Sequence, residues 1–299
     1  MSVIRQDIEF ISCGETCAGW LYLPERGAAR SPAVAMAHGM GAIKEFYIPA
    51  FAEAFANAGV AALLFDYRGH GTSTGEPRER IDPRMQIEDY RSALTFLALH
   101  EAIDEDRLGV WGTSFSGGHV LHLGAYDPRV KVVVSQVGAM DLYANVRRVL
   151  TPEQIAAQAE AIKGERKRGY ADPAPAYIPL SAPDGELALQ PDSTTHEWLV
   201  RAQEELAPHW HNRVTLDSIE RILEHAPALS IDRIAPKPLL MILARGDKWT
   251  PPELIREAFA RAGEPKRLIE IEGDHYAVYS GAGHAIAAEA AAGWFAEHL

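Results

Sequence analysis

Short apolar segments alternate along most of the chain with segments in which apolar residues recur at helical spacing. Turn residues bound the apolar segments, and this alternation predicts a parallel sheet flanked by helices. The expected strands are 33–37, 60–65, 108–111, 130–137, 238–244 and 267–271, and the expected helices include 48–58, 85–100, 252–262 and 284–298. Residues 4–12 and 16–24 are expected to form an antiparallel hairpin. The sequence therefore predicts an α/β fold.

The alternation is interrupted in the middle of the chain. The string Thr151-Pro152-Glu153-Gln154 is typical of a capping box that begins a helix, a stretch rich in Pro, Ala and Asp follows, and two more amphipathic helices come after it. This interruption resembles an inserted helical domain. The interpretation divides the chain into a core, formed by residues 1–140 and 235–299, and a helical cap or lid formed by residues 141–234.

Composition and charge exclude several classes of partner. The 299 residues are 47% hydrophobic and 23% charged, which is the balance of a soluble globular protein. A formal net charge of −12 repels phosphate backbones and anionic lipid headgroups, so we expect neither a nucleic-acid nor a membrane partner. The first ten residues, MSVIRQDIEF, lack the pattern of a secretion signal, and a cytoplasmic location is expected.

The sequence predicts no metal and no cofactor. Cys13 and Cys17 lie at the turn of the predicted hairpin, and two thiols without a second pair cannot complete a four-ligand zinc site. His119 and His122 have no third ligand at a suitable spacing. We expect all four side chains to pack within the hairpin and the helix that carry them.

Ser114 lies where a predicted strand meets a predicted helix. Gly112 precedes it by two positions and Ser116 follows it by two, which gives the small neighbours that a sharp strand-to-helix turn needs. This is the pattern of a nucleophile elbow. Ser116 also has small neighbours, Ser114 and Gly118, and remains an alternative. Ser114 is preferred because Ser116 would already lie in the first turn of the helix.

A serine nucleophile needs a base, which a carboxylate in turn orients. Asp247 follows the strand 238–244, and His275 follows the strand 267–271. In a parallel sheet these loops lie at the same edge as Ser114, so we expect the three side chains to converge. Asp141 and Asp274 are alternative acids, and His284 is an alternative base that is expected instead to begin the last helix.

Five strings in this order resemble the α/β-hydrolase superfamily: HGMG, FDYRGHG, GTSFSGG, GDKWTPP and GDHY. The resemblance covers roughly residues 16–140 and 235–299. Its first part, as far as WGTSFSGGHVL, is similar to the branch that contains dienelactone hydrolases, acyl-peptidases and polyketide thiohydrolases. The resemblance implies the α/β-hydrolase fold, a mostly parallel sheet flanked by helices, here with an inserted cap.

The same resemblance implies roles for individual residues. Ser114 would be the nucleophile, His275 the base and then the acid, and Asp247 the orienting carboxylate. The backbone N–H groups of Met40 and Phe115 would form the oxyanion hole, which stabilises the negative charge that develops on the substrate oxygen.

Four side chains are expected to contact a substrate. Trp249 follows the acid loop and Tyr276 follows the base. Trp210 belongs to an aromatic stretch of the cap, where packing between helices explains it equally well, and His38 could instead anchor the oxyanion loop. The expected partner is a small molecule, and the fold is compatible with a homodimer through the cap or an edge strand.

The sequence thus predicts a serine hydrolase that cleaves a carboxylic ester, thioester or lactone through an acyl-enzyme. Serine in place of aspartate at the elbow argues against dehalogenase and epoxide hydrolase chemistry, which need a carboxylate nucleophile. Hydrolysis of a C–C bond in a diketone by the same three residues is one alternative. A protein that keeps the fold and binds a ligand without turnover is another.

Overall fold

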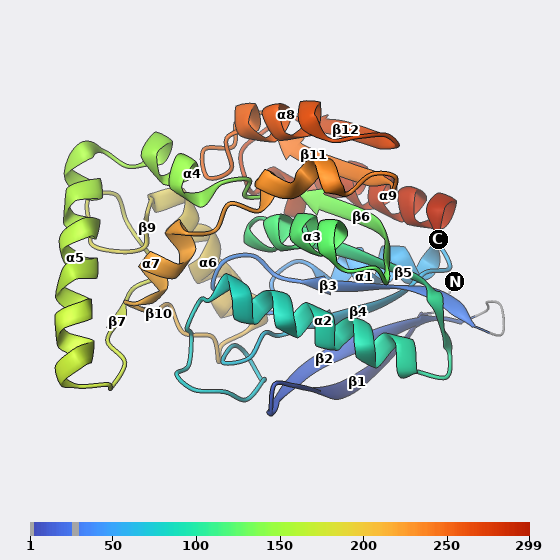
Figure 1. The fold of residues 1–299 in the computed structure, drawn as a ribbon, viewed down its shortest axis with the longest axis horizontal. Coiled ribbons are helices and arrows are strands. Elements are labelled where there is room, and N and C mark those ends of the chain that lie inside the picture. The colour runs from blue at the N-terminus through green and yellow to red at the C-terminus, as the bar shows by residue number, and fades with distance from the viewer. Residues whose placement is uncertain (1–2, 26–29) are drawn as a thin grey trace.

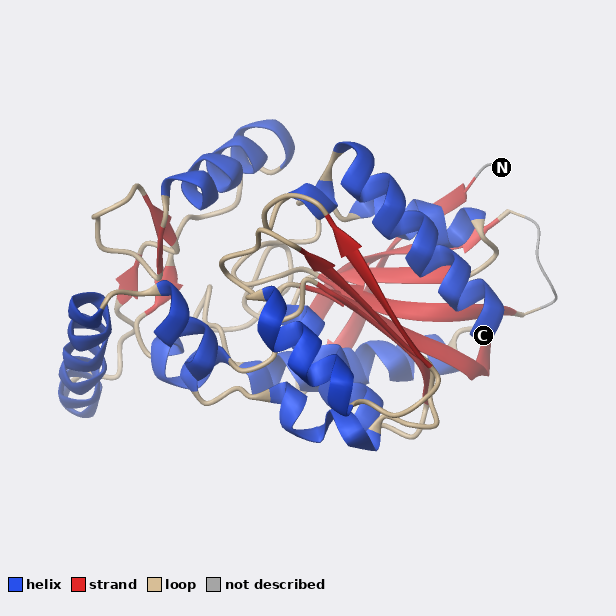
Figure 2. Cartoon of the chain, turned by 90° about the horizontal axis from the view of Figure 1, so that it is seen from above, coloured by secondary structure: helices blue, strands red, loops and turns tan. Residues whose placement is uncertain are grey.

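The computed structural model describes residues 3–25 and 30–299 and shows a central sheet with helices on both faces (Figures 1 and 2). The sheet has eight strands in the order β1-β2-β4-β3-β5-β6-β11-β12. Their bounds are β1 Val3–Ser12, β2 Glu15–Pro24, β3 Ser31–Ala37, β4 Ala61–Phe65, β5 Ile103–Thr113, β6 Val130–Gln136, β11 Leu239–Ala244 and β12 Lys266–Ile271. From β4 to β12 every neighbouring pair is parallel, whereas β1 and β2 form the predicted antiparallel hairpin.

Each face of the sheet has its own core. Helices α1 (Pro49–Asn57) and α9 (Gly281–His298) cover one face. Helices α2 (Pro83–Leu99), α3 (Phe115–Tyr126) and α8 (Pro252–Arg261) cover the other. Because side chains of a strand alternate between the two faces, a strand that is buried on both faces needs apolar side chains at most positions, and β4 and β11 are apolar throughout. This requirement explains why the predicted strands are continuous apolar segments.

Strand β3 shows this division directly. Val34 and Met36 pack toward Phe51 of α1, whereas Ala33 and Ala35 belong to the core on the side of α2. All four strand residues are completely buried. The parallel strands end at the left of Figure 1, and their carboxyl ends carry the loops in which the predicted catalytic residues lie.

Charged residues lie on both edges of the sheet. Arg5 and Asp7 are exposed on β1, and Arg267 is exposed on β12. Glu270 of β12 accepts hydrogen bonds from Arg256 at 2.8 and 3.0 Å. The two unpaired strand edges are therefore lined by polar, charged groups.

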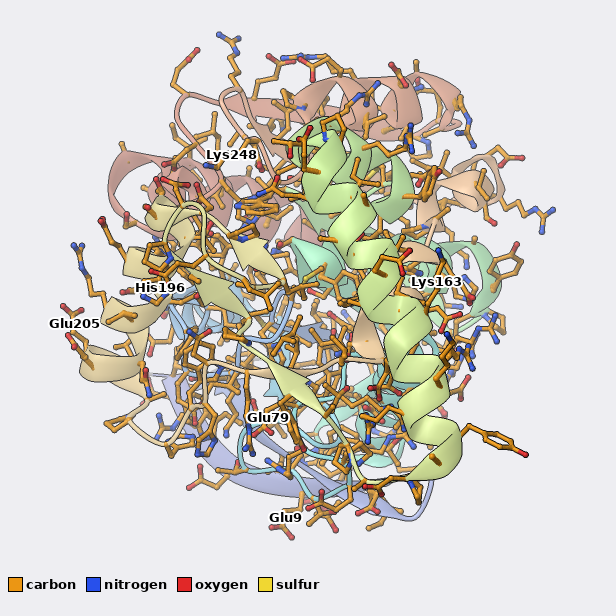
Figure 3. All side chains as sticks on the ribbon, turned by 90° about the vertical axis from the view of Figure 1, so that its left-hand side faces the viewer. Glu9, Glu79, Lys163, His196, Glu205 and Lys248 are labelled. Carbon is orange, nitrogen blue, oxygen red and sulfur yellow. The ribbon has the colours of Figure 1, made fainter. Side chains whose placement is uncertain are left out.

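The chain leaves the sheet between β6 and β11 and forms a separate layer beyond the carboxyl ends of the strands (Figure 1). Its elements are α4 Leu142–Val149, α5 Pro152–Ala171, β7 Tyr177–Ile178, β8 Ser181–Ala182, β9 Gln190–Pro191, α6 Ser193–Leu206, β10 Val214–Thr215 and α7 Ser218–Leu223. The 3₁₀ segment η1 Pro227–Arg233 leads back to the sheet and packs with α3 and α8 in the core on that face. Figure 3 looks onto this layer, with Lys163 of α5 in front. The division into core and cap at residues 141 and 234 stays a prediction.

The capping box predicted at the start of α5 is confirmed. The Gln154 backbone N–H donates to Thr151 Oγ1 at 3.3 Å, and the Thr151 N–H donates to Gln154 Oε1 at 2.8 Å. The short strands β7 to β10 were not predicted, because two-residue strands leave no periodic pattern in a sequence.

Within residues 3–25 and 30–299, no helix is both long enough and apolar enough to cross a membrane. Cys13 and Cys17 are free thiols in the β1–β2 hairpin, the first exposed and the second buried.

Candidate active site

Ser114 lies at a sharp turn between β5 and α3. Its backbone has φ +57° and ψ −119°, a conformation that is strained for a residue with a side chain. Two backbone hydrogen bonds hold it there: the Ser114 N–H donates to Gln136 O at 2.8 Å, and the Ala139 N–H donates to Ser114 O at 3.0 Å. The fold therefore has a sharp strand-to-helix turn at this place, called here the elbow, with Ser114 at its tip; the role of Ser114 as a nucleophile stays a prediction.

The elbow needs glycine at position 112. A Cβ on Gly112 would lie 2.2 Å from the carbonyl oxygen of Ser116, which belongs to the first turn of α3. We expect Gly112→Ala to lower the free energy of unfolding by about 3 kcal/mol, since backbone atoms cannot move aside as a flexible side chain can. Urea unfolding followed by circular dichroism measures this change.

Gly293 provides the matched control, because it lies exposed in α9 and a Cβ there would meet no atom within 4 Å. Gly293→Ala is expected to keep or raise the stability, since alanine favours a helix over glycine by about 1 kcal/mol. Equal stabilities for the two variants would contradict the steric argument at the elbow.

The structure brings Ser114, His275 and Asp247 together. Ser114 Oγ lies 3.0 Å from His275 Nε2, and His275 Nδ1 lies 2.6 Å from Asp247 Oδ2. All three come from loops at the carboxyl ends of parallel strands, namely those after β5, β12 and β11. His275 and Asp247 are only 6% and 4% exposed, so bulk water does not compete for their hydrogen bond.

The loop after β11 fixes the orientation of Asp247. Its Oδ1 accepts hydrogen bonds from the backbone N–H groups of Trp249 at 2.8 Å and Thr250 at 2.9 Å. Its Oδ2 accepts from the Thr250 hydroxyl at 2.5 Å and faces His275 Nδ1. A carboxylate can only accept, so Nδ1 carries the proton and the lone pair of Nε2 faces the Ser114 hydroxyl.

Thr250 was missed by the sequence analysis. An aspartate whose oxygen accepts from backbone groups two and three positions later is a common turn motif, and the spacing of Asp247 and Thr250 was the available signal.

The structure places the alternative residues elsewhere. Ser116 is completely buried, and its hydroxyl lies 2.9 Å from Ala37 O and 2.8 Å from the Thr113 N–H, so it ties the elbow to β3. Asp141 accepts from a backbone N–H at the start of α4, and exposed Asp274 accepts from the backbone of the residue two positions later. His284 begins α9 with its ring packed on a phenylalanine of α1. These contacts favour the preferred set over its rivals.

The proposed oxyanion donors, Met40 and Phe115, flank Ser114 and line the same cavity. Phe115 is the first residue of α3, so its N–H has no acceptor within the helix. A Cβ on Gly39 would lie 3.0 Å from the Cβ of Ser114, which shows how closely the loop after β3 approaches the elbow. Convergence of the two N–H groups on a substrate oxygen stays a prediction.

A buried ion pair holds this loop in place. Asp66, at the end of β4, accepts from the Lys44 backbone N–H at 2.8 Å and from Lys44 Nζ at 2.7 Å. Burial opposes the charge on Asp66, but Lys44 outweighs it and keeps the pKa of this carboxyl below its usual value. The loop that carries Met40 is thus anchored by side chains that do not touch the reacting atoms.

His38 and His70 lie behind the loop, both almost completely buried. His38 Nδ1 lies 2.9 Å from Gly39 O, and His70 Nδ1 lies 3.1 Å from Arg68 O. Burial lowers the pKa of both rings, that of His70 to about 4. Both imidazoles are therefore neutral at pH 7.

His70 makes the stability of the fold depend on pH. The unfolded chain takes up a proton on this histidine near pH 6.5, and the folded protein does so only near pH 4, so the stability falls as the pH is lowered through this interval. We expect the free energy of unfolding that is lost between pH 7 and pH 5 to be about 1–2 kcal/mol smaller in His70→Asn than in the wild type. Urea midpoints at the two pH values measure it. His209→Asn, at an exposed histidine, should leave the pH dependence unchanged.

The histidines of α3 are packed in the structure. His119 Nε2 lies 2.9 Å from Gln86 Oε1, and His119 Nδ1 lies 3.0 Å from His225 Nε2. The ring of His122 packs against that of Tyr126. In the part of the chain that the structure describes, no cluster of three or more His, Cys, Asp or Glu residues could hold a metal ion.

Two cavities meet at Ser114, and Met40 and Gln190 line both of them. The first, called here the aliphatic cavity, lies under α4 and α7 and is lined by Leu142, Val146, Val149, Ile219, Ile222 and Leu223. The second, called the aromatic cavity, lies under α6 and is lined by Phe46, Trp198, Leu199, His275, Tyr276 and Tyr279. The proposed oxyanion donor Phe115 lines the first, and the proposed base His275 lines the second.

The residues predicted to contact substrate are distributed around these cavities. Trp249 lines the aliphatic cavity, and His38 and Tyr276 line the aromatic one. Trp210 is not among the lining residues of either: its Nε1 donates to Gly41 O at 2.7 Å, so the indole braces the loop that carries Met40. Direct contact of these side chains with a substrate stays a prediction.

Comparison with solved structures identifies the class of fold. The α/β hydrolase GrgF from Penicillium sp. sh18 is similar with a TM-score of 0.84 and 28% identity, over 99% of each chain. The fold is the α/β-hydrolase fold predicted from the sequence motifs.

Comparison with protein families and curated proteins then gives the family. The model of the serine aminopeptidase S33 family matches residues 28–291, and the chain belongs to this family of α/β-hydrolase enzymes. Thiohydrolase aneE of Aspergillus aculeatus is 33% identical over 273 residues, which are 88% of this chain and 83% of that protein. Polyketide transferase ATR5 of Stachybotrys chlorohalonatus is 30% identical over 278 residues, 90% of this chain and 88% of that one.

Proposed function

We propose that this enzyme is a serine hydrolase that cleaves a carboxylic ester, thioester or lactone through an acyl-enzyme on Ser114. The observation that carries the proposal is the continuous chain of hydrogen bonds from Ser114 Oγ through His275 to Asp247, at 3.0 and 2.6 Å. A serine hydroxyl becomes a useful nucleophile only when such a base removes its proton.

In the proposed reaction, Ser114 Oγ attacks the carbonyl carbon while its proton passes to His275 Nε2. The negative charge on the carbonyl oxygen is met by the N–H groups of Met40 and Phe115, each of which contributes about 3–4 kcal/mol to the stabilisation of the transition state. His275 then gives the proton to the leaving oxygen or sulfur, and the bond to the leaving group breaks. Water repeats the sequence on the acyl-enzyme, which releases the acid and restores Ser114.

The two cavities support an orientation for the substrate. His275 must reach the leaving atom to protonate it, and His275 lines only the aromatic cavity. The leaving group therefore belongs in the aromatic cavity and the acyl chain in the aliphatic cavity. Since helices α4, α6 and α7 cover these cavities, residues 141–234 would act as the cap over the bound substrate.

The names of the relatives bear on which bond the enzyme cleaves and on which molecule accepts the acyl group. A thiohydrolase among them favours a thioester substrate. A polyketide transferase among them supports a second candidate function, in which an alcohol or amine takes the acyl group in place of water. The two functions share the acyl-enzyme and differ only in the second step, so product analysis with and without an added acceptor separates them.

A fluorophosphonate probe tests the proposal without a known substrate. Labelling of the folded protein at pH 7, followed by peptide mass spectrometry, is expected to place the phosphonate on Ser114 and on no other serine. If the folded protein is not labelled, the proposal that Ser114 is an activated serine is refuted. After labelling at Ser114, a panel of esters, thioesters, lactones and diketones distinguishes ester chemistry from hydrolysis of a C–C bond.

Location and assembly are the remaining parts of the proposal. A cytoplasmic location stays a prediction. A small-molecule substrate is supported by the two cavities that meet at Ser114. A homodimer stays a prediction.

A further inference from the structure

The hydroxyl of Thr195 connects the loop that carries Asp247 with the loop that carries His275. Thr195 belongs to the first turn of α6 and is 1% exposed. Its Oγ1 accepts a hydrogen bond from Trp249 Nε1 at 2.8 Å and another from the Tyr276 hydroxyl at 2.8 Å. The same Oγ1 donates to Asp192 Oδ2 at 2.5 Å.

These contacts use the full hydrogen-bonding capacity of a hydroxyl group, which is one donated proton and two accepting lone pairs. An indole N–H can only donate, and a carboxylate can only accept. The direction of the bonds from Trp249 and to Asp192 is thereby fixed, and the Tyr276 hydroxyl must donate to the remaining lone pair. A side chain without an oxygen at this position would leave two half-buried donors, on Trp249 and Tyr276, without this acceptor.

Both donors adjoin the triad. The Trp249 backbone N–H donates to Asp247 Oδ1 at 2.8 Å, so a shift of the indole also moves an anchor of that carboxylate. Tyr276 directly follows His275, and the two rings are 5.3 Å apart. Thr195 Oγ1 is therefore hydrogen-bonded to one residue of the loop that carries Asp247 and to one residue of the loop that carries His275.

The start of α6 is held rigidly. Asp192 is its N-cap residue and also accepts from the Thr195 backbone N–H at 2.8 Å. Lys248, which is labelled in Figure 3, pairs with the other oxygen of Asp192. Burial opposes the charge on Asp192, but hydrogen bonds from Lys248 and Thr195 outweigh it and keep the pKa of this carboxyl below its usual value.

We propose that Thr195 is a positioning residue. When α6 is packed over the active site, its Thr195 hydroxyl holds Asp247 and His275 in the correct positions relative to each other. This inference rests on the proposed hydrolase function. Thr195 takes no part in the chemical steps; it acts through Trp249 and Tyr276. The consequence is that the catalytic geometry is complete only when α6 lies closed over the strand ends.

Three variants test the proposal. Thr195→Val keeps the shape of the side chain but removes the hydroxyl, and is expected to lower kcat by about 10- to 100-fold, the usual cost of a small misplacement of catalytic groups. Thr195→Ser keeps the hydroxyl and is expected to stay within about threefold of the wild type. Thr194→Val changes the exposed neighbouring threonine and should leave kcat unchanged.

The rate of fluorophosphonate labelling separates positioning from a purely structural role. If Thr195 positions the triad, Thr195→Val labels more slowly, in parallel with its kcat. If Thr195 only holds α6 in place, its loss opens the site and labelling is unchanged or faster, which would overturn the proposal. A Thr195→Ser variant as impaired as Thr195→Val would overturn it as well.

Tyr276→Phe provides an independent test should Thr195→Val not fold. It removes one of the two donors to Thr195 and retains the ring that packs on Trp198 at 4.8 Å. Its labelling rate is expected to fall by about 3- to 10-fold. An unchanged rate would contradict the proposal. Wild-type protein that does not label at all would instead refute the hydrolase function, so the two failures are distinguishable.

Discussion

Ser114→Ala is expected to lower kcat/KM by about 10⁴- to 10⁶-fold, as loss of the nucleophile does in other triad enzymes. The Ser114 hydroxyl is the group that faces His275 Nε2, at 3.0 Å, and alanine has no atom that can replace it. Stability should change little, because the backbone bonds that hold the elbow remain. Initial rates with the best ester or thioester of the panel, together with a urea unfolding curve, measure both effects.

Ser116→Ala is the companion variant. Its hydroxyl bridges the backbones of β3 and β5, so we expect a loss of stability of about 1–3 kcal/mol with kcat largely retained. The reverse result, an active Ser114→Ala and an inactive but folded Ser116→Ala, would transfer the role of nucleophile to Ser116.

Asp247→Asn is expected to lower kcat by about 10⁴-fold. Both oxygens of Asp247 accept hydrogen bonds, from two backbone N–H groups on one side and from Thr250 and His275 on the other. An asparagine amide must present its NH₂ group to one of these sets of donors. When the NH₂ group faces His275, the imidazole loses its acceptor and adopts the tautomer that cannot take the proton of Ser114.

Asp141→Asn is the matched control for the acid. Asp141 caps α4 by accepting from the Ala144 N–H at 2.9 Å, and asparagine caps a helix about as well as aspartate. Both rate and stability should therefore remain close to those of the wild type. A damaging Asp141→Asn beside a harmless Asp247→Asn would show that the acid had been assigned to the wrong loop.

The regular part of the fold could be predicted because both faces of the sheet are buried. Residues in β4 and β11 are apolar at every position, so their strands stand out from the amphipathic helices around them. Because the strands and helices differ in this way, the predicted bounds of α1 and α9 are also close to the observed ones. Alternating strands and helices also imply which ends of the strands lie together, which brought Ser114, Asp247 and His275 to one edge.

Contacts between distant segments could not be predicted in this way. The layer between β6 and β11 is held by side chains such as Thr195 and Trp210, whose partners lie far away in the sequence. Neither residue differs in its local pattern from an ordinary helix or loop position. Trp210 illustrates the difficulty: its sequence context left contact with a substrate and packing within the cap equally open, and the acceptor of its indole N–H, Gly41 O, lies 169 positions away in the sequence.

The charged edges of the sheet have a consequence for behaviour at high concentration. An unpaired edge strand can recruit the edge of another molecule and start an aggregate, and charged side chains are the usual protection against this. Here Arg5 and Asp7 lie on one edge, and Arg267 and Glu270, which pairs with Arg256, lie on the other. A strand of another molecule that added to either edge would have to remove water from these charged groups, which disfavours uncontrolled edge-to-edge growth of the sheet.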